Sequence, residues 1–115
     1  MLLAFTPRGV CIRRRAEGGL LGGLYEFPSA EGHLNAAEAV QYLSELGFTA
    51  VSDPQPLPPA KHVFTHLIWR MQGFSFLCEA APEGFVEVDA EGLIAHALPS
   101  ALRKYREIAL DALEK

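Results

Sequence analysis

The sequence predicts one α+β domain in which a mixed or antiparallel sheet packs with two main helices. Short apolar or alternating stretches, most of them bounded by Gly or Pro, indicate strands. Two longer stretches carry apolar residues at helical spacing. Their order along the chain, β-β-β-α-β-β-α, is typical of an α+β fold. The 115 residues are enough to bury a hydrophobic core without disulfides or metals.

The chain begins with a predicted β-hairpin. Residues 2–6 and 10–15 are strand-like, and the turn triplet Pro-Arg-Gly at 7–9 separates them. The Gly-rich segment 16–23 is expected to form a flexible loop. Residues 24–28 then form a short strand that ends at a proline.

The first helix follows this strand. Asn35 can cap its N-terminus, and Glu38 lies three residues later, as in a capping box. Gly47 is expected to end the helix as the residue after its C-cap. Residues 48–52 then read as a further strand. The stripe expected to be buried consists of Ala36, Ala39, Val40, Leu43 and Leu46.

The second half of the chain opens with residues 53–60, which hold four of the eight prolines. They predict an extended linker or loop, since proline donates no backbone hydrogen bond. Residues 61–79 predict one long strand, or two strands joined near 72–73. Residues 84–89 indicate another short strand or a strand-to-loop connection. The last helix is expected from about 100 to 114, and its apolar face carries Leu102, Tyr105, Ile108, Ala109, Ala112 and Leu113.

Composition narrows the class of protein. Half of the residues are hydrophobic and 21% are charged, as in ordinary globular proteins. The N-terminal charges follow the apolar stretch, the reverse of a secretory signal, so we expect a bacterial-type cytoplasmic location. Cys11 and Cys78 lie in separate apolar runs and are expected to be buried free thiols. The net charge of −4 argues against a strongly basic nucleic-acid binder, but basic islands at 13–15 and 102–106 allow a basic face.

The strand "GLYEFP", a loop and a capped helix ending in "ELGF" resemble the Nudix fold. Nudix hydrolases carry the helix pattern Arg-Glu-hydrophobic-x-Glu-Glu-x-Gly-hydrophobic, whose glutamates hold divalent metal ions against a pyrophosphate. Aligned on Gly47, this chain has Val40, Gln41 and Ser44 in place of the arginine and two of the glutamates. Only Glu45 remains. The resemblance therefore implies the fold, without a metal site or hydrolase activity.

Three segments resemble a particular branch of that fold, the C-terminal domain of the A/G-specific adenine DNA glycosylases (the MutY family). They read "RRRAEGGLLGGLYEFPS", "KHVFTHLIWRM" and "ALPSALRK", in the expected order. Tyr25 stands where this family usually has tryptophan, and Thr65 where many members have serine.

The MutY resemblance implies a domain that inspects 8-oxoguanine opposite a mispaired adenine. In that family a separate N-terminal helical domain removes the adenine and usually carries an iron–sulfur cluster. No four-cysteine set for a cluster occurs here, since the chain has two cysteines. We therefore expect residues 1–115 to be a single C-terminal domain without its catalytic domain, without a cofactor, and non-catalytic alone.

The reading residues that the resemblance implies are Phe64, Thr65 and His66. Oxidation at C8 turns guanine N7 from an acceptor into an N–H donor, and a hydroxyl such as that of Thr65 can accept from it. Phe64 could wedge into base steps, and His66 could bind the backbone or hold the loop. The alternative is an ordinary strand with a core Phe. A metal site at His62 and His66 has no third ligand nearby.

The cations expected to contact phosphates are Arg13, Arg15, Lys61, Arg103 and Lys104. Strand alternation places Arg13 and Arg15 on one side, and the arginine between them on the other. Arg103 and Lys104 fall in the first turn of the last helix, where a bound phosphate would offset their unfavourable interaction with the helix dipole.

The expected partners are duplex DNA containing 8-oxoguanine and the N-terminal catalytic domain of the same enzyme. We expect a nucleoid-associated monomer with no membrane contact. Two alternatives remain at this point. The first is an active Nudix-type hydrolase of modified nucleotides, and the second is a protein-interaction module that uses the Pro-rich segment 53–60.

Overall fold

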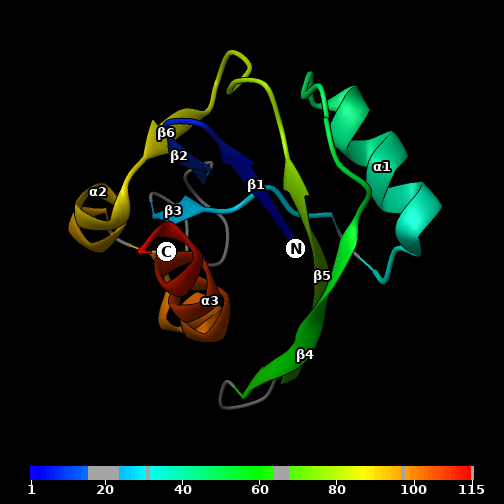
Figure 1. Cartoon of the computed structure of the whole chain (residues 1–115). Coiled ribbons are helices and arrows are strands. Elements are labelled where there is room, and N and C mark those ends of the chain that lie inside the picture. The colour runs from blue at the N-terminus through cyan, green and yellow to red at the C-terminus, as the bar shows by residue number, and fades with distance from the viewer. Residues whose placement is uncertain (16–23, 31, 64–67, 97, 115) are drawn as a thin grey trace.

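The structure is a computed structural model that describes residues 1–15, 24–30, 32–63, 68–96 and 98–114. Figure 1 shows a curved sheet with helices on both sides. In chain order the elements are β1 (Leu2–Thr6), β2 (Gly9–Arg14), β3 (Tyr25–Glu26), α1 (Ala36–Glu45), β4 (Gln55–Val63), β5 (Ile68–Leu77), β6 (Val86–Val88), α2 (Ala90–Ala95), a 3-10 turn (Ser100–Leu102) and α3 (Arg103–Leu113).

The six strands form a mixed sheet in the order β3-β2-β1-β5-β4, with β6 paired to β2. β1 and β5 are parallel, with Leu2 opposite Phe74. The other pairings are antiparallel, including the predicted β1–β2 hairpin. The predicted α+β architecture with a mixed sheet is thereby confirmed, and α2 is a third helix that the sequence did not indicate.

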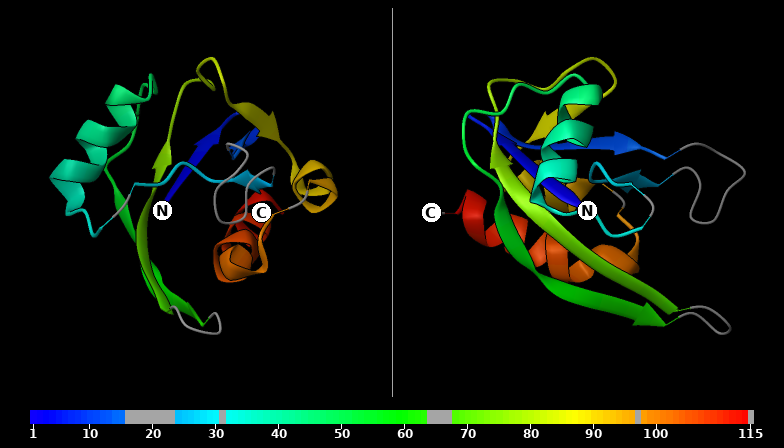
Figure 2. Two further views of the ribbon diagram at one scale, coloured as in Figure 1. Left: turned by 180° about the vertical axis from the view of Figure 1, so that it is seen from behind. Right: turned by 90° about the vertical axis from the view of Figure 1, so that its right-hand side faces the viewer.

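Two cores lie on opposite faces of the sheet because side chains alternate along each strand. Leu3 belongs to the core that includes Tyr105 of α3, whereas its neighbours Leu2 and Ala4 belong to the core that includes Leu43 of α1. Figure 2 shows α1 on one side of the strands and α2 with α3 on the other. β1 is therefore buried on both faces.

α1 confirms the expected cap. The Asn35 side chain accepts from the backbone of Glu38, and the Glu38 carboxylate accepts from the backbone of Asn35. Gly47 has a φ of 101°, the left-handed conformation expected after a C-cap. The buried stripe is narrower than predicted, since Val40 is 40% exposed and Ala36 is also exposed.

The strand predicted at 48–52 is wrong. Instead of a strand, this segment forms a single isolated β-bridge, between Ala50 and Cys78. The last helix is confirmed, although its first three residues form a 3-10 turn. Tyr105 and Ala109 are buried as expected, while Ala112 is exposed.

The linker or loop predicted at 53–60 is also wrong, because residues from Gln55 onward belong to β4. β4 is at the edge of the sheet, where a proline can turn its missing N–H away from the neighbouring strand. Leu57 pairs with Gly73 and Ala60 with Met71. One extra residue on β4 makes a bulge there, and the bulge accommodates Pro58 and Pro59.

The segment 61–79, predicted as one long strand or two strands joined near 72–73, is divided between residues 63 and 68 instead. Residues 61–63 end β4, and residues 68–77 form β5, which runs antiparallel to β4. The four residues between them, 64–67, lie outside the described part of the chain. The prediction erred because "KHV" and "LIWRM" continue one alternating pattern across the strand junction.

Cys11 and Cys78 are buried free thiols, as predicted. Among the described residues, no helix is long and apolar enough to cross a membrane.

Candidate nucleic-acid interface

The β4–β5 hairpin carries the predicted reading residues at its junction. Phe64, Thr65 and His66 are outside the described residues, so their geometry is not part of the site. Their flanks are described: Val63 of β4 pairs directly with Ile68 of β5. Both flanking side chains are exposed, at 62% and 50%.

Arg13 and Arg15 share one carboxylate. Nε of Arg13 lies 3.1 Å from Oε2 of Glu26, and Nη1 of Arg15 lies 2.6 Å from Oε1. The antiparallel pairing of Arg13 with Glu26 across β2 and β3 produces this arrangement. Glu26 is 8% exposed, and burial strengthens its charge-assisted hydrogen bonds. Arg13 and Arg15 therefore lie on the same side of the strand, as predicted, and the buried carboxylate of Glu26 binds both of them.

The guanidinium of Arg13 also lies over the ring of Phe85, 5.1 Å from its centroid. This cation–π contact fixes Arg13 between an aromatic face and a carboxylate. Arg15, by contrast, lines a cavity.

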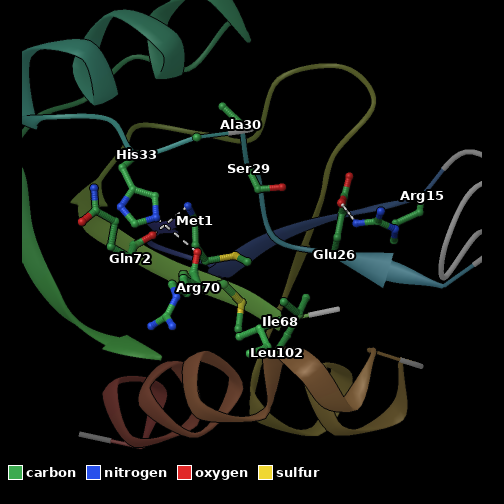
Figure 3. Close-up of a pocket in the computed structure, with 12 residues that line it drawn as sticks. Met1, Arg15, Glu26, Ser29, Ala30, His33, Ile68, Arg70, Gln72 and Leu102 are labelled. Atoms are coloured by element: carbon green, nitrogen blue, oxygen red, sulfur yellow. Dashed lines mark hydrogen bonds and ion pairs between the residues drawn. The ribbon is translucent and has the colours of Figure 1, made fainter. Parts of the chain in front are cut away.

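The cavity has a volume of about 480 Å³ and lies beside the β4–β5 hairpin. Arg15 and Glu26 line one side, while Ile68 and Arg70 of β5 contribute to another. Figure 3 shows the Arg15–Glu26 pair across the hollow from Arg70 and His33. Two predicted features, the basic end of β2 and the base of the reading hairpin, thus meet at one cavity.

Hydrogen bonds tie the segment before α1 to β5 and to α1 itself. His33 Nε2 lies 3.3 Å from the carbonyl oxygen of Arg70, and Gln72 Nε2 donates to the carbonyl of Leu34 at 3.2 Å. The hydroxyl of Tyr42 donates to the carbonyl of Ser29 at 2.7 Å. The first two contacts hold this segment against β5, which carries Arg70, and the third holds it against α1.

The other three predicted cations are exposed. Arg103 pairs with Glu107 at 3.2 Å within α3. Lys104 donates to the carbonyl of Pro59 at 2.9 Å, so it lies against β4. Lys61 is opposite Arg70 on the hairpin.

The sequence reasoning missed Glu26 and Arg70. Arg70 had a usable signal, because it lies two residues from Ile68 on the same alternating face.

The helix positions at which Nudix hydrolases bind metal do not fit a divalent cation here. Gln41, Ser44 and Glu45 are exposed on α1, and they offer one carboxylate, which Gln41 Nε2 contacts at 3.4 Å. Within the described ranges, no three His, Cys, Asp or Glu side chains come together as possible ligands. Hard cations bind through several carboxylate oxygens, so no catalytic step is assigned to a metal.

The two thiols are also unsuited to nucleophilic chemistry. Burial, with a contribution from Glu87, raises the pKa of Cys11 to about 12. Burial raises the pKa of Cys78 to about 11. Both are therefore protonated near neutral pH, and the thiolate is the reactive form.

Comparisons with known proteins agree with this architecture. The model of the NUDIX domain family matches residues 1–107. The C-terminal domain of mouse MUTYH, from the crystal structure of its complex with human PCNA, superposes with a TM-score of 0.77 at 24% identity. That alignment covers 96% of this chain and 85% of the mouse domain.

A second similar structure comes from a structural and functional study of MutT from Aliivibrio salmonicida and Vibrio cholerae. It has a TM-score of 0.60 at 19% identity and covers 96% of this chain and 95% of the other. Both likenesses show the shared fold. With the family match over nearly its whole length, the chain belongs to the NUDIX domain family.

Proposed function

We propose that this domain recognises 8-oxoguanine in duplex DNA for an A/G-specific adenine DNA glycosylase. The segments "GLLGGLYEFP" and "HVFTHLIW" support this assignment. The similarity to the C-terminal domain of mouse MUTYH over 96% of the chain supports it further. The adenine would be removed by the N-terminal catalytic domain of the same enzyme, which is the second proposed partner.

The observation that carries the proposal is the meeting of the hairpin with the arginine-lined cavity. Phe64, Thr65 and His66 follow β4 directly. Ile68 and Arg70, just beyond them, line the same cavity as Arg15. A polyanion that reaches the reading residues would thus find cations beside it, which is where phosphate contacts set register and orientation.

Lesion reading itself is assigned to Thr65. The oxidised base presents an N–H where guanine presents a lone pair. The threonine hydroxyl accepts that hydrogen bond while donating another. One well-placed contact of this kind gives about 1–3 kcal/mol of discrimination between bases.

The rival function is hydrolysis of a modified nucleotide, since the MutT study concerns the same fold. The residues of α1 speak against it, because Gln41 and Ser44 supply no carboxylate at two of the glutamate positions that bind metal, and Val40 replaces the arginine. Magnesium-dependent release of pyrophosphate or phosphate from oxidised nucleotides, absent in Glu45→Gln, would favour this rival.

The test compares two duplexes that differ only in 8-oxoguanine or guanine opposite adenine, with binding followed by fluorescence anisotropy. Thr65→Val keeps the shape of the side chain and removes its hydroxyl, so the preference for the oxidised duplex should fall by about 1–3 kcal/mol. Thr65→Ser should retain the preference. Thr49→Val is the matched control, because Thr49 is exposed just after α1 rather than in the hairpin. A Thr65→Val variant with the full preference would refute the assignment.

A further inference from the structure

One face of the β4–β5 ribbon carries four exposed side chains with a simple pattern. Val63 pairs with Ile68, and Lys61 pairs with Arg70. Directly opposed residues project from the same face of a sheet, as do residues two apart. The four side chains therefore share one face, with an apolar pair nearest the junction and a cationic pair behind it. We call this set the hairpin face.

The side chains of the hairpin face lower the stability of the domain when nothing is bound to them. Like charges placed directly opposite one another across two strands destabilise a sheet, as Lys61 and Arg70 do. Among the ion pairs of the described residues, none involves either of them. Arg13, Arg15 and Arg103, in contrast, each lie against a glutamate. Within the described part of the chain, the hairpin thus presents two cations that no carboxylate pairs with.

The apolar pair is also unfavourable, because it exposes large apolar side chains to water. Val63 and Ile68 are among the most exposed large apolar side chains described. Figures 1 and 2 show that the ends of β4 and β5 project away from the body of the domain. All four side chains of the hairpin face are exposed, so an occupant can contact each of them.

We propose that the hairpin face is a DNA-contacting surface, in which Lys61 and Arg70 bind phosphates and Val63 and Ile68 pack against exposed base or sugar edges. This inference rests on the proposed function and adds residues to its site. Charge complementarity selects the occupant, since two opposed cations suit a chain of phosphates. The order of the pairs fits as well, because apolar side chains at the leading end can enter a groove while the cations behind them remain at the backbone.

The cationic pair is tested by the salt dependence of binding to the oxidised duplex. Each phosphate contact contributes about 0.9 to the slope of log K against log salt concentration. Lys61→Gln and Arg70→Gln should each lower the slope by about that amount and weaken binding to both duplexes equally. Arg8→Gln makes the same change in net charge in the exposed β1–β2 turn, and it should leave the slope unchanged. Equal slopes in all three variants and the parent would overturn the phosphate assignment.

The apolar pair is tested separately with Val63→Thr and Ile68→Thr, which keep β-branching and add a hydroxyl. Both should weaken binding with no change in the salt slope. Val51→Thr is the control, since Val51 is equally exposed, at 61%, and lies beyond α1 in the segment that bridges to Cys78. Unaltered DNA affinity in both hairpin variants would overturn the apolar role. That result, combined with weaker capture of the catalytic domain, would assign the pair to a protein contact instead.

The two proposals fail differently. If the hairpin variants lower affinity for both duplexes while the parent shows no preference for 8-oxoguanine, the DNA surface stands and lesion reading falls. If Thr65→Val abolishes the preference while the hairpin variants behave as the parent, lesion reading stands and the hairpin face falls.

Discussion

Nη1 of Arg15 lies 2.6 Å from Oε1 of Glu26, and this pair joins the end of β2 to β3 at the wall of the cavity. The carboxylate is nearly buried, whereas the arginine side chain keeps 26% of its surface exposed. Because Arg13 binds the other carboxylate oxygen, two cations meet one anion. The cluster of Arg13, Arg15 and Glu26 therefore keeps a net positive charge although both carboxylate oxygens are engaged.

Glu26→Gln should destabilise the domain, because it leaves two arginines without their shared anion. We expect the free energy of unfolding in urea to fall by about 1–3 kcal/mol, a range that allows for solvent screening of the partly exposed arginines. Glu107→Gln is the matched control, since its ion pair with Arg103 is exposed at both partners. That control should change stability by less than about 0.5 kcal/mol. Equal effects of the two substitutions would contradict a structural role for Glu26.

Gly9→Ala and Gly84→Ala separate backbone strain from steric overlap. Both glycines have positive φ, 148° and 92°. A Cβ at Gly9 would lie 2.0 Å from the carbonyl oxygen of Val88, whereas a Cβ at Gly84 would have no neighbour within 4 Å. Gly84→Ala should cost about 1–2 kcal/mol from the left-handed conformation, and Gly9→Ala about 3 kcal/mol or more because overlap adds to strain. Thermal unfolding gives the order, and a smaller loss for Gly9→Ala would be inconsistent with the packing of β6 on β2.

The buried thiols should make stability decline in alkaline solution. The pKa of Cys11 rises from 9.0 to about 12 on folding, so the fold favours the protonated thiol. This contribution is complete below pH 9 and is lost as the pH rises toward 12, because the unfolded chain loses its proton first. Urea unfolding between pH 7 and pH 11 should show the decline, and Cys11→Ala should reduce it. A thiol reagent that modifies the folded protein rapidly at pH 8 would contradict the burial of Cys11 and Cys78.

The prolines of β4 should protect the edge of the sheet. β4 ends the strand order, and an unpaired edge with free N–H groups is a template for association with another chain. Pro56→Thr with Pro58→Thr restores two donors there, so the sedimentation coefficient should rise with protein concentration. Pro7→Thr, in the exposed β1–β2 turn, is the control and should not show this rise. A double variant that sediments like the parent at every concentration would refute the protective role.

The sequence predicted correctly the elements that are set by neighbouring residues, namely the first hairpin and the first helix. The β1–β2 hairpin follows from its turn triplet, and α1 follows from the reciprocal hydrogen bonds between Asn35 and Glu38. The segment 53–60 was misread because proline's missing donor is a defect within a sheet but not at its edge. Edge position is a property of the strand order, which a single segment does not contain.

In the candidate site, too, the sequence predicted what depends on neighbouring residues and missed what depends on strand pairing. Alternation along β2 predicted that Arg13 and Arg15 share a side, and the shared contact with Glu26 agrees. The identity of that partner depends on the register between β2 and β3, and the inclusion of Arg70 depends on the pairing of β4 with β5. Such long-range registers are set by packing of the whole core, so neither residue could be assigned from spacing alone.

The parallel pairing of β1 with β5 also has a consequence for how the chain reaches its native state. Leu2 is opposite Phe74, so the strand at the centre of the sheet gains its second neighbour from a segment that is synthesised much later. Closing so large a loop costs chain entropy before any contact compensates for it. The β1–β2 hairpin can form early, but both cores require β5. Folding of this domain is therefore expected to be slow for its size and to occur after most of the chain has left the ribosome.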